Sequence, residues 1–350
     1  MNIRRTLCQV GVVLLSFASY SGYAQANPGS PVDHMTQLNE MELALQKKYL
    51  SYMSVVAHGN SARRQERKRE DLIKSIQESI QQVGRIKPYK GDASLRNTYS
   101  DYLKLLLTVF KEDYHKIVDM EAIAEQSYDN MEAYLLAQEK ASEKLGDAAE
   151  KIGPSYKEFA ARHNVILTES DKESKLTKKL RLAGEVSVYY HKIYLVFFKS
   201  SHQEGYLIKA IESYDVNAIE QSRNTLSKYS IEGLNSLDSI KSFKGDASLV
   251  GSTRKVLEFY KQEAESIPAV TDFLLKKDEF EKIKKAFDAK PQSKRTQQDI
   301  DNYNKSLTEV NNGINKFNKM MQDYNKNRSK QIENWNAASK HFMDSHIPNA

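Results

Sequence analysis

The stretch Lys-Gly-Asp-Ala-Ser-Leu at residues 90–95 decides the fold, because the same six residues return at 244–249. Each copy places a glycine before an aspartate: Gly91 before Asp92, and Gly245 before Asp246. Glycine readily adopts the left-handed backbone of a tight turn, and aspartate is a preferred cap at the start of a helix. The pattern predicts two equivalent helix-to-helix turns with capping aspartates. The alternative is that the turn amides bind an anionic ligand.

The sequence before the two hexapeptides also matches when they are superimposed. Apolar residues at helical spacing then meet apolar residues: Leu72, Ile80, Val83 and Ile86 meet Leu226, Leu234, Leu237 and Ile240. Self-similarity of this kind is the signature of a repeated structural unit. We therefore predict an all-α protein of two tandem, related antiparallel helical-bundle units, with long amphipathic helices and an elongated shape.

The expected boundaries follow from this duplication. Residues 1–26 are predicted to be a signal peptide, 27–167 the first bundle and 168–350 the second. A second echo, Phe159-x-x-x-His163 against Phe342-x-x-x-His346, has a larger offset than the hexapeptides. The second copy should therefore be longer, with its extra residues around the polar loop 290–298 and a longer C-terminal helix.

The first residues have the three parts of a secretory signal. Arg4 and Arg5 precede a mostly apolar run, and Ala24-Gln25-Ala26 has the small-residue pattern of a cleavage site. We expect cleavage after Ala26 and placement in the periplasm, at the outer surface or outside the cell. Cys8 is the only cysteine and lies inside this segment, so the mature chain should contain no disulfide.

The composition narrows the function classes. Only 14 glycines and 7 prolines occur among 350 residues, and 28% of the residues are charged, which suits long amphipathic helices. The formal net charge of +6 is mild and does not favour a nucleic-acid partner. We find no motif for a nucleophile, a dinucleotide or a nucleoside triphosphate. We therefore expect no enzyme activity, no catalytic, cofactor-binding or metal-binding residues, and no small-molecule substrate.

The last helix, expected from about residue 297 to 341, carries two regular columns. The first alternates steps of four and three, as a heptad seam does: Tyr303, Leu307, Val310, Ile314, Phe317, Met321 and Tyr324. The second is a set of asparagines seven residues apart: Asn304, Asn311, Asn318 and Asn325. Asparagines beside a seam can bond to a neighbouring helix and fix its register, or meet a polar ligand such as a glycan.

Five basic residues gather at the start of one expected helix: Arg63, Arg64, Arg67, Lys68 and Arg69. Cations are unfavourable at this end of a helix dipole, and the aligned segment 217–224 of the second half has only Arg223. The favoured interpretation of this cluster is a solvated charged face, because charge-rich helix surfaces are ordinary. Contact with an anionic membrane or an acidic partner is the alternative.

Glu112-x-x-His115 has the spacing of half a di-iron site, but the aligned positions in the second half are Ser266 and Ala269. A metal-dependent enzyme that uses Glu112 and His115 is accordingly the third and weakest hypothesis.

Four stretches together resemble exported helical surface-protein families of diderm bacteria, whose function is unknown. They are Phe243–Leu249, Leu257-Glu-Phe-Tyr-Lys261, Asp301-Asn-Tyr-Asn304 and Asn311-Asn-Gly-Ile-Asn315. The resemblance covers most of the mature chain, rests on structural motifs and implies no catalytic residues.

The leading hypothesis is an exported, non-enzymatic structural or interaction protein of the bacterial envelope, with an envelope protein as its partner. A membrane-active or anionic-lipid-binding protein that uses the basic cluster 63–69 is the alternative, with peripheral contact to the membrane.

Overall fold

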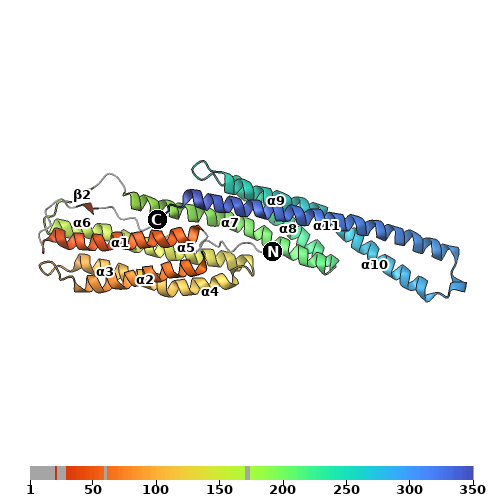
Figure 1. Ribbon diagram of the computed structural model, residues 1–350, viewed down its shortest axis with the longest axis horizontal. Helices are drawn as coiled ribbons and strands as arrows, with labels where there is room; N and C mark the ends of the chain where they lie inside the picture. The colour runs from red at the N-terminus through yellow and green to blue at the C-terminus, as the bar shows by residue number, and fades with distance from the viewer. Residues whose placement is uncertain (1–19, 22–28, 59–60, 170–173, 350) are drawn as a thin grey trace. The chain divides into compact units, whose positions relative to one another are not determined.

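The computed structural model describes residues 20–21, 29–58, 61–169 and 174–349, which form helices joined by turns and loops, with one short strand pair (Figure 1). Strands β1 (Tyr20–Ser21) and β2 (Thr168–Glu169) pair antiparallel. The predicted signal peptide lies outside the described residues except for β1. The all-α prediction is confirmed, since several long helices pack antiparallel to one another.

The described chain divides into two compact units. The first comprises the described residues up to Lys192 together with those from Ser339 on, and the second comprises Ile193–Ala338. The expected boundary lay between residues 167 and 168. A division by compactness does not test whether two copies exist, so the tandem bundles of residues 27–167 and 168–350 stay a prediction, as does the elongated shape.

The first unit is built from antiparallel helices. They are α1 (Pro31–Ala57), α2 (Ala62–Arg85), α3 (Ser94–Thr108), the π-helix η1 (Val109–Asp113), α4 (Tyr114–Ala124), α5 (Tyr128–Glu150) and α6 (Ile152–Arg162). α1 packs on α2, α2 on α3, α3 on α6, and α4 on α5. The start of α7 (Lys175–Glu212) and the end of α11 (Gln297–His346) complete the unit.

Local signals place the helix starts. The Ser30 hydroxyl accepts a hydrogen bond from the Asp33 amide at 3.0 Å, and Pro31 occupies the first helical turn of α1. The Ser127 hydroxyl accepts the Asn130 amide at 3.1 Å at the start of α5. Each cap satisfies an amide that has no partner within its own helix.

The core of the first unit consists of apolar side chains that recur at helical spacing. The most deeply buried side chains include Leu38, Leu45, Leu72, Ile76, Val83, Leu95, Tyr99 and Phe159. Burying each such side chain contributes about 1.5–3 kcal/mol relative to leaving it in water. Packing of these stripes, rather than the intrinsic helix propensity of the residues, stabilises the bundle.

The second unit contains the rest of α7, α8 (Val216–Asp238), α9 (Ser248–Ser266), α10 (Pro268–Ala289), the short 3-10 turn η2 (Gln292–Lys294) and α11 up to Ala338. α8 packs extensively on α9. Gly233 allows this approach, because a Cβ atom there would lie 2.9 Å from Leu257 Cδ1 and 3.2 Å from Val196 Cγ1.

Within the second unit, α10 and the first half of α11 form a two-helix hairpin, with residues 290–296 at its tip (Figure 1). The ring centroids of Phe287 and Tyr303 lie 4.6 Å apart near the tip, and those of Phe273 and Phe317 lie 5.2 Å apart further back. The polar loop in which the sequence places the extra residues of the second half is therefore the tip of this hairpin.

Candidate functional site

The two hexapeptides form turns of the same geometry. Lys90 and Gly91 have φ angles of 47° and 84°, and Lys244 and Gly245 have φ angles of 50° and 90°. Two successive residues with positive φ are the mark of a type I′ turn. Glycine takes this conformation without a steric cost, whereas each lysine tolerates it at a cost of about 1–2 kcal/mol.

Backbone hydrogen bonds close each turn in both directions. The Tyr89 amide donates to the Asp92 carbonyl at 3.1 Å, and the Asp92 amide donates to the Tyr89 carbonyl at 2.9 Å. Phe243 and Asp246 form the same two bonds, at 3.0 and 2.9 Å. The side chain of each aspartate then accepts the amide of the serine two residues later, at 2.9 Å in the first turn and 2.8 Å in the second.

The capping residues differ by one position from the expectation. Helices α3 and α9 have Ala93 and Ala247 at the N-cap position, so Asp92 and Asp246 stand one residue earlier. The physical reason is the turn itself. Each aspartate must pair across the turn through its backbone, which leaves only its side chain to reach the helix start.

The carboxylate of Asp92 also ties the first turn to the end of α6. Its Oδ2 atom lies 2.9 Å from His163 Nε2 and 3.1 Å from Arg162 Nε. Burial alone would raise the pKa of Asp92, but bonds from Ser94 and His163 and the nearby charge of Arg162 lower it below its usual value. Both carboxylate oxygens are thus engaged within the fold, which does not favour this turn as an anion site.

The basic cluster is split between the surface and the core. Arg63, Arg64 and Arg67 are exposed and Lys68 is half-buried, whereas Arg69 is buried. The structure therefore brings together only the first four cations as a surface, at the beginning of α2.

Arg69 has a structural role instead. Its Nη1 donates to the carbonyl of Phe110 at 2.9 Å, its Nε donates to Glu66 at 2.9 Å, and its guanidinium lies 4.7 Å from the centre of the Tyr114 ring. Phe110 belongs to the π-helix η1, where the regular helical hydrogen bonding changes. Arg69 thus secures α2 to this irregular turn.

The Glu112 and His115 pair is not assembled into a metal site by anything that the structure describes. Glu112 is exposed in η1, and the side chain of His115 lies outside the described set. Among the described residues, no group of three or more His, Cys, Asp or Glu side chains could hold a metal ion. The metal-enzyme hypothesis stays untested.

A buried carboxylate lies in the core of the first unit. Glu42 is 5% exposed, and it accepts hydrogen bonds from the Tyr99 hydroxyl at 2.9 Å and from the Gln46 amide nitrogen at 3.1 Å. Burial raises the pKa of Glu42 to about 7, against the lowering effect of these two bonds. The sequence held a signal for this residue, because Leu38, Glu42, Leu45 and Tyr49 follow one helical stripe.

A buried ion cluster lies in the second unit. The Arg328 guanidinium bonds to Glu204 through Nε, to Glu263 through Nη2 and to Asn325 through Nη1. Neither glutamate is more than 2% exposed, and the second oxygen of each carboxylate has no partner among the described residues. Burial raises the pKa of Glu263 and lowers that of Arg328. The sequence also carried a signal for the burial of Arg328. Met321, Arg328 and Trp335 follow one another at intervals of seven residues, in the register of the heptad seam.

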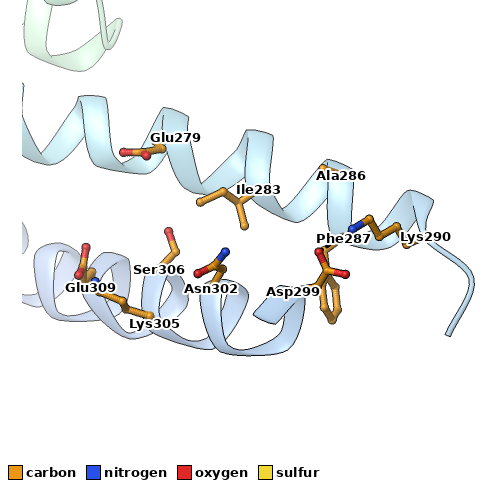
Figure 2. A pocket seen from close by; sticks show the side chains of 10 residues that line it. All are labelled: Glu279, Ile283, Ala286, Phe287, Lys290, Asp299, Asn302, Lys305, Ser306 and Glu309. Carbon is orange, nitrogen blue, oxygen red and sulfur yellow. Dashed lines mark hydrogen bonds and ion pairs between the residues drawn. The ribbon is translucent and has the colours of Figure 1, made fainter. Parts of the chain in front are cut away.

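The hairpin carries a groove of about 440 Å³ between α10 and α11 (Figure 2). Ile283 from α10 and Asn302 and Ser306 from α11 project into it from opposite sides. Seven further residues line it: Glu279, Ala286, Phe287, Lys290, Asp299, Lys305 and Glu309.

The tip end of this groove is organised by an ion pair. Lys290 Nζ lies 2.5 Å from Asp299 Oδ1, and the amide of Thr296 donates to Asp299 Oδ2 at 2.9 Å. The bond from Lys290 and the bonds from Thr296 together lower the pKa of Asp299 to about 2. With charges of both signs and amide and hydroxyl groups along its length, the groove suits polar contact with a macromolecule.

Comparison of the chain with protein-family models, with curated proteins and with solved structures found no match. The resemblance to exported helical surface proteins of diderm bacteria therefore stays a prediction. No helix within the described ranges combines the length and the apolar character that crossing a membrane requires.

Proposed function

We propose that this chain is an exported, non-enzymatic interaction protein of the bacterial envelope, and that the α10–α11 hairpin is its contact element. The single observation that carries the proposal is the construction of the hairpin. Its two helices are held together by inward-facing rings, while its groove side presents charged and amide groups. The physical inference is that a packed pair of helices with a polar outer face can form hydrogen bonds and ion pairs with another macromolecule.

The packing inside the hairpin supports this view. A Cβ atom on Gly313 would lie only 2.6 Å from Phe273 Cδ2, so the Phe273 ring packs directly against α11 at this point. Val310 is buried between the two ring pairs that flank it. A merely flexible linker between α9 and the end of α11 would need neither feature.

A photo-crosslinking amino acid placed in the groove tests the proposal in the native bacterium. Replacement of Asn302 or Ser306 should yield a discrete covalent adduct with an envelope protein. Lys228, an exposed residue of α8, is the control position. If the groove positions give no adduct, or if Lys228 gives the same adduct, the hairpin is not the contact element.

A second candidate function, peripheral binding to an anionic membrane, is favoured by the three exposed arginines at the start of α2. Arg63, Arg64 and Arg67 place positive charge at the helix end where it is electrostatically unfavourable, which suggests a role outside folding.

Flotation with anionic liposomes at low salt tests this candidate. The wild-type chain should float with the liposomes, and the R63A/R64A/R67A variant should not. The variant K316A/K319A/K326A loses the same charge from exposed positions of α11 and should still float. Absence of wild-type binding at low salt removes the candidate.

We also infer that the two halves are copies of one helical unit that has diverged after duplication. The matching φ angles and hydrogen bonds of the two turns support this inference. In this view the second copy acquired the hairpin, and its contact function with it, by extension of α10 and α11.

A further inference from the structure

The exposed flank of the hairpin carries a second helical seam that α10 does not cover. The inner column of α11, defined as Tyr303, Val310 and Phe317, faces α10. On the side away from the groove lies a stripe that we call the outer seam: Ile300, Asn304, Leu307, Asn311, Ile314 and Asn318. Its residues alternate steps of four and three, as in a coiled coil.

The outer seam is only partly covered by the described residues. Ile300 and Ile314 are each 37% exposed, and Leu307 is half-buried. Asn304, Asn311 and Asn318 are exposed. Asn325, the next asparagine of the same column, is also exposed but accepts a hydrogen bond from the buried Arg328. The asparagines of the outer seam are thus exposed along the hairpin, and its apolar residues are only partly covered.

The outer seam carries no charged side chain. The row beside it, Asp301, Thr308 and Asn315, adds one charge, although 28% of the whole chain is charged. A foreign helix is normally selected by complementary charges at the edges of the seam. The outer seam and the row beside it carry almost no charge. No charge pattern on this surface would therefore select a foreign helix, and none would repel an identical surface.

Asparagine suits contact between identical surfaces. Its side-chain amide both donates and accepts hydrogen bonds, so two asparagines can satisfy each other. Asparagines within a coiled-coil interface also fix register and oligomeric state, at some cost in affinity. Apolar residues that alternate with them would supply the burial.

We propose that the outer seam pairs with the outer seam of a second copy of this chain, so that two hairpins form a four-helix coiled coil. The proposal rests on the proposed function, because it names one partner of the hairpin. The pairing uses the flank opposite the groove, which leaves the groove open in the dimer.

Light scattering coupled to size exclusion, over a wide range of protein concentration, tests this pairing on the purified chain. The wild type should change from monomer to dimer as its concentration rises. Asn311→Lys combined with Asn318→Lys should raise the dimer dissociation constant about a hundredfold or more, because like charges then face each other. The control, Gln298→Lys combined with Asn312→Lys, adds the same charge at exposed positions outside the seam and should dimerise as the wild type does.

A charge-swap experiment makes the test specific for self-contact. Asn311→Glu combined with Asn318→Glu should also be monomeric, and an equimolar mixture with the double lysine variant should restore the dimer. Circular dichroism should show that both variants keep the helix content of the wild type.

A wild type that stays monomeric at every concentration overturns the proposal, as does a dimer that survives both double substitutions or a mixture that does not pair. A monomer whose outer seam is protected from labelling only after an oligosaccharide is added would assign the asparagines to a glycan instead. Groove crosslinks to another protein, found together with a monomeric purified chain, would leave the proposed function standing and remove only the self-pairing.

Discussion

Glu42 shows how one buried polar residue inside an apolar stripe makes the stability of a helical bundle depend on pH. No cation is among the causes that set its pKa; the groups that act on it are the Tyr99 hydroxyl and the Gln46 amide. Tyr102 and Tyr156 also lie near enough for the carboxylate charge to raise their own pKa values. The folded chain therefore favours the protonated form of Glu42.

The first prediction concerns the pH dependence that follows. The pKa of Glu42 is about 7 in the folded chain, against an ordinary value of 4.5, so the folded state holds an extra proton between these pH values. Stability should consequently fall as pH rises from about 4.5 to 7, by about 3 kcal/mol from this group, and stay level above that.

Glu42→Gln keeps the hydrogen-bonding shape without the charge, so its free energy of unfolding relative to wild type should rise between pH 5 and pH 8. Urea unfolding at the two pH values measures this difference. An unchanged difference would mean that Glu42 does not hold a proton in the folded core.

Unlike Glu42, the buried carboxylates Glu204 and Glu263 have a cation, Arg328, between them. Arg328→Met removes that cation and leaves Glu204 and Glu263 unpaired, so we expect a loss of about 3–5 kcal/mol at neutral pH. The loss should shrink near pH 5, because burial raises the pKa of Glu263 and its carboxyl group is protonated there. Urea unfolding at both pH values checks this. The triple variant E204Q/E263Q/R328M is the control and should recover most of the stability. A loss below about 1 kcal/mol would contradict a buried ion cluster.

At the scale of elements, the sequence pattern predicted helix limits well. The helix expected from about residue 297 to 341 corresponds to α11, because apolar steps of three and four are a local signal. The π-helix η1 was not predicted. Arg69 reaches the Phe110 carbonyl within η1 from another helix, and no local pattern reports such a contact.

Gly313 is an element-scale feature whose role depends on a neighbouring helix. Gly313→Ala should destabilise the second unit by about 1–3 kcal/mol, because the new methyl group overlaps the Phe273 ring. Gly251→Ala in α9 is the matched control: no atom lies within 4 Å of its added Cβ, and helix propensity should stabilise it by up to about 1 kcal/mol. Thermal unfolding followed by circular dichroism compares the two. Equal effects would show that the hairpin is not closely packed at this point.

At the scale of the whole molecule, stability should vary along the chain. The helices of the bundles bury side chains such as Leu45, Leu72 and Leu226 almost completely, whereas most residues between 281 and 309 are exposed or half-buried. Regions with few buried apolar contacts open locally at low free-energy cost.

We therefore expect amide hydrogens in residues 281–309 to exchange faster than those in α8 and α9. Hydrogen exchange followed by mass spectrometry measures this directly. Dimer formation through the outer seam should slow exchange in the hairpin as the protein concentration rises. Uniform protection along the chain at low concentration would contradict the separation into a stable bundle and a less stable hairpin.

Some features of the candidate sites could be predicted from nearby residues in the sequence, whereas others depend on residues that are distant in the chain. Arg63, Arg64 and Arg67 could be recognised as a surface cluster from the sequence, but the burial of Arg69 could not, since it depends on Phe110 and Tyr114 across the bundle. Gly91 and Gly245 were recognised as turn residues, whereas the shift of the cap from Asp92 to Ala93 follows from pairing across the turn.

The sequence by itself determined the all-α class, the positions of the long helices and the presence of two equivalent turns, because periodicity, capping and glycine conformation act within a few residues. Only the tertiary structure decided which polar side chains are buried, where Arg328 meets Glu204 and Glu263, and which flank of α11 remains open. These features depend on the register between helices that are distant in the chain. That register is set by side-chain packing across the bundle, which the local pattern does not contain.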